Sequence, residues 1–119
     1  MRDFLSFIFI LILLFFGCDS RICSNKIIDE KVSPDSKYVA SIFERDCGAT
    51  TPYVRVVCLR LSNTKFDPEN YDDWVFTIHG KSDVKVGWKS AEILKIFYSN
   101  TGDTPTMRSN WGAISISYK

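Results

Sequence analysis

The residues of this chain that are best suited to chemistry lie in one polar run, residues 46–51, which reads Asp-Cys-Gly-Ala-Thr-Thr. A cysteine becomes a strong nucleophile when a base or a positive neighbour lowers the pKa of its thiol. Arg45 precedes the run, but Asp46 opposes its charge, and the single histidine, His79, lies far away in sequence. We therefore expect Cys47 to be half of a disulfide rather than a nucleophile, and the threonines after it to bond to the backbone of a turn.

The same run has a second interpretation as a ligand-binding loop. Its polar residues would then supply the contacts, and the candidate residues are Asp46, Gly48, Thr50 and Thr51. The spacing of these residues matches no phosphate-binding glycine loop. This candidate ligand loop stays open beside the disulfide-and-turn interpretation.

Two further groups of residues could bind metal. His79 precedes Gly80 at the end of a predicted strand, and one histidine with oxidised cysteines does not make a zinc site. The segment 67–73 holds four carboxylates, and calcium favours such oxygen-rich loops, but the glycine and the final glutamate of an EF-hand loop are missing. We expect a solvated loop there, with a weak calcium site as the alternative. For the protein as a whole we expect no metal, no cofactor and no enzymatic activity.

The N-terminus of the chain carries an apolar run, residues 4–16. This run is shorter than the roughly 20 apolar residues that span a bilayer, and its length is typical of an export signal. It ends at Gly17 and Cys18, which resemble the lipobox of bacterial lipoproteins, although Phe15 and Phe16 stand where the lipobox has other residues. The alternatives are a plain cleaved signal and an uncleaved anchor.

The lipobox resemblance implies a location and a domain organisation. Residues 1–17 would be a removed signal peptide, and Cys18 would carry a diacylglycerol on its sulfur and an acyl chain such as palmitate on its amine. We therefore expect a protein held on the cell membrane through a lipid anchor, facing the periplasm or the cell exterior. Residues 18–35 would form a tether and residues 36–119 a single β domain.

The formal net charge of the chain is +1 at pH 7. Proteins that bind nucleic acid or anionic lipid through their overall charge carry a strong basic field, which a charge of +1 does not provide. We therefore expect no nucleic-acid partner. The partners that remain are the membrane, through the lipid anchor, and an envelope protein.

The chain has four cysteines, and three remain for pairing if Cys18 is lipidated. In an oxidising compartment we favour a Cys23–Cys47 bridge. It would close a loop of roughly 25 residues and stabilise the domain by about 3 kcal/mol. Cys58 would then be a buried free thiol acting as a small hydrophobe. A Cys47–Cys58 bridge is the alternative.

The rest of the chain reads as strands separated by turn residues. Alternating apolar and polar side chains, or continuous apolar runs, predict six strands at residues 38–45, 53–61, 74–79, 84–89, 93–99 and 114–118. No segment after the signal has a helical period. Short connections favour an all-β antiparallel meander, curled into a small sandwich or partial barrel. Three tryptophans are expected to anchor its core: Trp74, Trp88 and Trp111.

Residues 33–40 and 43–51 resemble a family of small uncharacterised bacterial exported proteins. The hallmark of that family is Ser-Pro-Asp-Gly-Lys, a strand, then Asp-Cys-Gly-Ala-Thr-Thr, with an earlier cysteine upstream. Cys23 matches that earlier cysteine, so the resemblance also implies the Cys23–Cys47 pairing. This chain departs from the pattern at Ser36, where the family has glycine. The resemblance implies no activity.

Three functional hypotheses follow from the sequence. The first is a non-enzymatic, membrane-anchored module that binds an envelope protein. The second is an inhibitor or immunity-type lipoprotein that blocks a hydrolase or toxin. The third is a thiol enzyme that uses Cys47, which requires that cysteine to be free.

Overall fold

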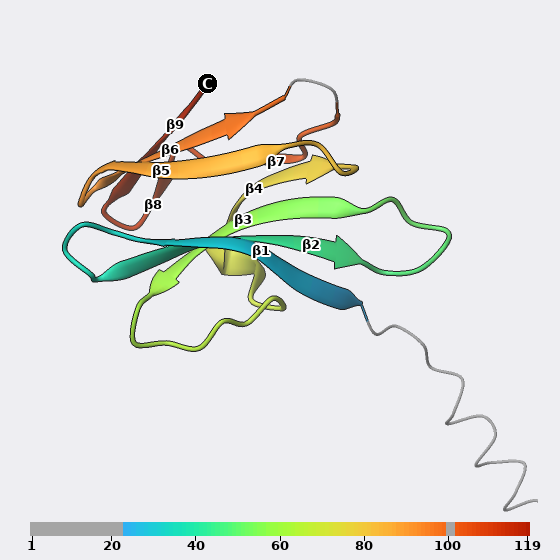
Figure 1. Ribbon diagram of the computed structural model, residues 1–119, viewed down its shortest axis with the longest axis horizontal. Coiled ribbons are helices and arrows are strands. Elements are labelled where there is room, and N and C mark those ends of the chain that lie inside the picture. The colour runs from blue at the N-terminus through green and yellow to red at the C-terminus, as the bar shows by residue number, and fades with distance from the viewer. Residues whose placement is uncertain (1–22, 100–101) are drawn as a thin grey trace, which may run out of the picture.

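The computed structural model describes residues 23–99 and 102–119, and within them the chain forms two β-sheets and no α-helix (Figure 1). The strands are β1 (Ser24–Val32), β2 (Tyr38–Asp46), β3 (Val54–Leu61), β4 (Trp74–His79), β5 (Val84–Ser90), β6 (Ile93–Tyr98), β7 (Thr106–Met107), β8 (Asn110–Trp111) and β9 (Ile114–Tyr118). A single 3₁₀ turn, η1 (Tyr71–Asp73), precedes β4. The sheets pack as a sandwich that does not close into a barrel, which confirms the all-β prediction.

The first sheet has the order β1-β2-β3-β4-β7, and all of its neighbours are antiparallel. It is the predicted meander, because β1 to β4 follow one another in sequence and in space. The strand β2 lies in its interior and is buried along most of its length. This position explains why both faces of β2 are apolar in sequence.

The second sheet has the order β5-β6-β9-β8, and here the predicted meander was wrong. The strand β9 pairs in parallel with β6. A parallel neighbour requires a crossover connection, and the chain between the two strands supplies it: β7 joins the first sheet and β8 then pairs with β9. Strand periodicity reports burial and carries no information on strand direction, so the sequence could not reveal this pairing.

The prediction of a tether over residues 18–35 is wrong for much of its length, because Ser24–Val32 form strand β1. It forms a full edge strand on β2, with a register shift between Ile27 and Asp29. Its apolar residues are largely exposed: Ile27, Ile28 and Val32. An edge strand that buries little apolar surface has no clear alternation, which is why its pattern reads as a polar linker.

Two hydrophobic clusters hold the layers together. The larger lies between the two sheets and includes Ile42, Phe76, Leu94 and Ile114. The smaller lies on the opposite face of the first sheet, where Phe43, Val56 and Cys58 pack against three partly buried residues: Val54, Phe66 and Trp74. The segment 62–73 covers this face, so the first sheet is buried on both sides (Figure 1).

The three tryptophans are divided between these clusters. Trp88 and Trp111 pack against the larger cluster, and Trp74 packs against the smaller one. All three are only partly buried. They therefore border the core rather than fill it, which leaves Trp74 available at the surface beside the smaller cluster.

The turn between β1 and β2 holds Ser36 in a backbone conformation that is unusual for serine. Ser36 has a φ of 63°, a left-handed backbone conformation in which glycine is the usual residue. The turn is fixed by hydrogen bonds around it: the Ser33 hydroxyl donates to Asp35 Oδ1 at 2.6 Å, and the Ser36 N–H donates to the Ser33 carbonyl at 2.9 Å. The same turn therefore forms with serine in place of glycine.

No helix in residues 23–99 and 102–119 is long and apolar enough to cross a membrane. The predicted signal, residues 1–17, and the lipid-attachment residue Cys18 lie outside the described residues.

Candidate functional site

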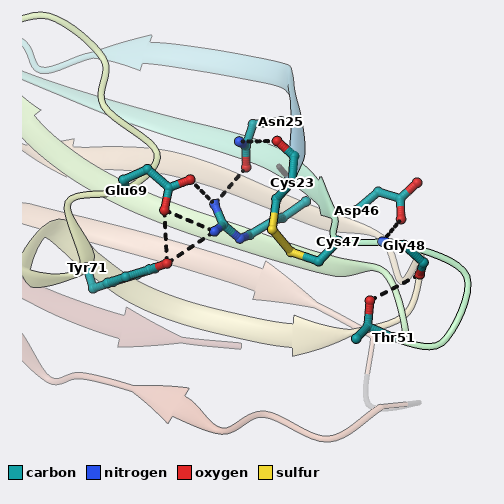
Figure 2. Close-up of a disulfide and its surroundings, with 9 residues drawn as sticks. Cys23, Asn25, Asp46, Cys47, Gly48, Thr51, Glu69 and Tyr71 are labelled. Carbon is teal, nitrogen blue, oxygen red and sulfur yellow. Dashed lines mark hydrogen bonds and ion pairs between the residues drawn. A yellow bond between two sulfur atoms is a disulfide. The ribbon is translucent and has the colours of Figure 1, made fainter. Parts of the chain in front are cut away.

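The disulfide predicted from the sequence is present between Cys23 and Cys47 (Figure 2). Cys23 directly precedes β1 and Cys47 directly follows β2, so the bridge closes the open end of the β1–β2 hairpin. The Cα atoms of the two cysteines are 4.1 Å apart. In this state Cys47 has no thiolate to offer, so the hypothesis of a Cys47 nucleophile does not hold for the oxidised protein.

The run 46–51 forms a compact turn beyond the bridge. The Gly48 N–H donates to Asp46 Oδ1 at 3.0 Å, and Gly48 itself has a φ of 119°. The Thr51 N–H and Thr51 hydroxyl both donate to the Gly48 carbonyl, at 3.2 and 3.1 Å. Thr50 is exposed beside them. These contacts are those of a self-satisfied turn, and the ligand-loop interpretation stays a prediction.

The centre of the site is Arg45, the last residue but one of β2, which is only 8% exposed. One guanidinium nitrogen donates to Asn25 Oδ1 at 3.1 Å and to Glu69 Oε1 at 3.0 Å. The other donates to Glu69 Oε2 and to the Tyr71 hydroxyl, each at 3.1 Å (Figure 2). Arg45 therefore links β1 and β2 to the segment that precedes β4.

Two aromatic rings complete the surroundings of this guanidinium. Its central carbon lies 5.5 Å from the Trp74 ring centroid and 5.7 Å from the Tyr71 ring centroid. The two rings meet edge to face at 4.7 Å. A buried charge is tolerated only when it is paired and hydrogen-bonded, and Arg45 meets both conditions through a two-point contact with one carboxylate.

The pKa of the Glu69 carboxyl is lowered from its ordinary value, first by the hydrogen bonds from Arg45 and then by the hydrogen bond from Tyr71. A lowered pKa in the folded state means that the ionised carboxylate stabilises the fold. This stabilisation is fully present above the unfolded-state pKa of glutamate. It is lost as the pH falls through the lower folded-state pKa.

We therefore expect the difference in melting temperature between the wild type and Glu69→Gln to depend on pH. The wild type should melt at the higher temperature near neutral pH, and the difference in melting temperature should shrink as the pH is lowered below the unfolded-state pKa of glutamate. Thermal unfolding followed by circular dichroism at each pH measures the difference. A difference that stays constant as the pH is lowered would show that the ion pair does not stabilise the fold.

An open groove of about 690 Å³ lies beside the disulfide and beside Arg45 with its hydrogen-bond partners. Its lining is mostly apolar and includes Cys23, Arg45, Cys47, Thr51, Pro52, Val54, Glu69, Tyr71, Trp74 and His79. The described hydrogen bonds of Arg45 all go to the protein's own groups, so the groove presents mainly aromatic and aliphatic surface. Such a groove suits a small apolar ligand or one projecting side chain of a partner protein.

His79 lines the groove at the end of β4, and its backbone N–H donates to the Asp103 carbonyl at 2.9 Å. It is half-buried. The structure thus brings His79 and the disulfide to the same groove, a proximity that their sequence separation does not reveal.

The acidic segment 67–73 is organised by its own backbone and by Arg45. Asp67 Oδ1 accepts from the Glu69 N–H at 2.9 Å, and Asp73 Oδ2 accepts from Asn70 Nδ2 at 3.0 Å. Burial raises the pKa of the Asp73 carboxyl above its usual range. In the part of the chain that the structure describes, no group of three or more histidine, cysteine, aspartate or glutamate side chains is placed to hold a metal ion.

Cys58 is a free and buried cysteine, as predicted. Burial raises the pKa of its thiol to about 12, so it is protonated at neutral pH. A buried, protonated thiol reacts slowly and packs as a small apolar group. It belongs to the smaller hydrophobic cluster and not to the groove.

No protein-family model, curated protein or solved structure matches this chain.

The contacts of Arg45 with Asn25, Glu69 and Tyr71 were not predicted, although the sequence carried a signal for a buried arginine. The face of β2 that carries Val39 and Phe43 continues with period two to Arg45, so the alternation places this arginine on a buried face. A buried arginine requires an acidic partner, and the segment 67–73 is the most acidic in the mature chain. What the sequence could not identify is which carboxylate reaches it.

Proposed function

We propose that this protein is an exported lipoprotein, held on a membrane by lipids at Cys18, whose β domain binds another protein of the cell envelope. The observation that carries the proposal is the Cys23–Cys47 disulfide at the entry to the domain. Disulfides form and persist in oxidising compartments outside the cytoplasm. A disulfide in this position agrees with the export signal that the sequence predicts.

The groove beside this disulfide supports binding as the role of the domain. It combines an exposed tyrosine, a tryptophan and an arginine, which are the residue types most often dominant in protein interfaces. Tyr71 is 56% exposed, although its ring packs against Trp74. The ring is therefore held in place before a partner arrives, which lowers the entropy lost on binding.

The short segment between Cys18 and Cys23 would keep the groove close to the membrane. An extended chain spans at most roughly 3.6 Å per residue, so these residues reach no more than about 18 Å. A groove held there faces partners at or near the membrane surface. This placement rests on the lipidation of Cys18.

The anchor is tested by labelling with palmitate in the native host. We expect the wild type to be labelled and found in the membrane fraction, and Cys18→Ala to lose the label entirely, because no thiol remains to accept the lipid. Ser20→Ala is the control and should be labelled like the wild type. An unlabelled wild type, or a mature protein that still begins at Met1, would contradict the anchor.

The binding role of the groove is tested by cross-linking in intact envelopes. We expect Tyr71→Ser to lower the recovery of the cross-linked partner by about tenfold or more, as for an interface residue of central importance. Tyr53→Ser is the matched control, because Tyr53 is also exposed but does not line the groove. Thermal melting checks that both variants are folded. Equal recovery of the cross-linked partner from both folded variants would show that the partner does not bind at the groove.

A further inference from the structure

The outer face of the second sheet carries a cluster of lysines that the net charge of the chain conceals. In β5 and β6 the side chains alternate, and Val84, Val86, Leu94 and Ile96 are buried toward the first sheet. The residues between them point to the other face. That face presents Lys85, Lys89, Ile93, Lys95 and Phe97, which we call the lysine face.

The register brings these residues together across the two strands. Lys85 lies opposite Phe97, and Gly87 lies opposite Lys95. The Phe97 ring leans over the glycine, since a Cβ at Gly87 would sit 3.8 Å from Phe97 Cε2. The Lys95 ammonium lies 5.4 Å from the centre of the same ring. Phe97 is therefore an apolar centre with lysines around it.

The lysines of this face form no ion pair with the acidic side chains that the structure describes. In the described ranges 23–99 and 102–119, the ion pairs involve Lys31, Arg45, Arg55 and Arg60 and none of these three lysines. The one carboxylate in residues 84–98 is Glu92, in the turn between the strands. The charge of Lys89 is the largest cause of a lowered pKa of Lys95, with Lys119 adding to it. The positive charges thus crowd one another.

Crowded like charges around exposed apolar groups favour an anionic partner that also offers apolar surface. Ile93 and Phe97 are each 39% exposed. Such a centre with a charged rim is the usual anatomy of a protein–protein interface. A lysine ammonium is a compact point charge that donates hydrogen bonds to a carboxylate without the fixed, two-point geometry of an arginine fork.

We propose that the lysine face is a docking surface for an acidic protein surface with an apolar centre. An anionic membrane is the other surface of matching charge, and the position of the face argues against it. In Figure 1 the described chain begins at the start of β1 in the first sheet, on the side of the molecule away from the second sheet. If the chain is anchored at Cys18, as the proposed function states, the lysine face points away from that membrane.

The experiment measures binding of two fluorescent peptides to the full chain in neutral detergent micelles. One peptide consists of glutamate only and is about 20 residues long. In the other peptide every fourth residue is leucine. Binding is followed by fluorescence anisotropy at about 20 mM salt. We expect the combined substitution Lys85→Gln, Lys89→Gln, Lys95→Gln to weaken binding of both peptides by about tenfold or more. We expect Phe97→Ser to weaken binding of the leucine-containing peptide alone.

The matched control is Lys26→Gln, Lys37→Gln, Lys65→Gln, three exposed lysines outside the second sheet. It changes the net charge equally, so equal weakening in both triple variants would reduce the effect to overall charge and overturn the proposal. The proposal is also overturned if neither peptide binds, or if phosphatidylglycerol added to the micelles displaces both peptides. Because binding is measured in detergent, its outcome is independent of whether Cys18 is lipidated.

Discussion

Phe43→Ala is expected to lower the free energy of unfolding by about 3–5 kcal/mol, the usual cost of removing a fully buried phenylalanine side chain. Phe43 is 0% exposed and forms the centre of the smaller hydrophobic cluster. Its ring meets Phe66 at 5.3 Å and Trp74 at 5.8 Å, both edge to face. Because these contacts join the first sheet to the segment 62–73, the loss should also loosen Glu69 and Tyr71 over the groove.

Chemical denaturation of the variant and the wild type measures this difference. Phe43→Leu is the matched control and should cost far less, because leucine keeps most of the buried volume. Val32→Ala, at an exposed position, should change the free energy of unfolding by less than about 0.5 kcal/mol. A loss below about 1 kcal/mol for Phe43→Ala would mean that segment 62–73 is not held by this cluster.

Cys47→Ser is expected to destabilise the domain by about 3 kcal/mol under oxidising conditions. The bridge joins residues 24 positions apart, and its removal restores freedom to the unfolded chain. For a domain of this size the melting temperature should fall by roughly 12–24 °C. The start of β1 is the part of the sheet that the bridge holds, so it should be the first to lose hydrogen-exchange protection.

Reduction provides the control for this prediction. A reducing agent should lower the melting temperature of the wild type to that of Cys47→Ser and should leave the variant unchanged. The double variant Cys23→Ser, Cys47→Ser should match the single one, because both lack the same bridge. An unchanged melting temperature in oxidised Cys47→Ser would show that the bridge does not stabilise the fold.

The Cys23–Cys47 disulfide and the hydrophobic cluster around Phe43 both support the groove. The disulfide fixes one wall, and the Phe43 cluster supports the segment that provides Glu69 and Tyr71 on the other. Arg45 connects the walls through its contacts to Asn25 and Glu69. The residues that form one wall lie far in sequence from those that form the other. The groove therefore exists only when both walls are folded.

Much of the fold could be predicted because buried positions produce a pattern of apolar residues within each strand. Alternating residues in β4, β5 and β9 and the doubly apolar β2 identified these strands. The cysteine count and the resemblance favoured the Cys23–Cys47 bridge with Cys58 free, and the structure confirms both against the alternative Cys47–Cys58 bridge. Strands β7 and β8 have two residues each, too few to show any period.

The sequence by itself determined that this protein is an all-β domain, because alternation is a local property, and it favoured a Cys23–Cys47 bridge over a Cys47–Cys58 bridge without deciding between them. Only the tertiary structure decided the parallel pairing of β6 and β9, the ion pair of Arg45 with Glu69 and the gathering of lysines on one face. Each of these joins segments whose approach is set by how the sheets pack and cross. A nearly neutral chain can therefore gather lysines on one face, since the fold, and not the composition, decides which charges become neighbours.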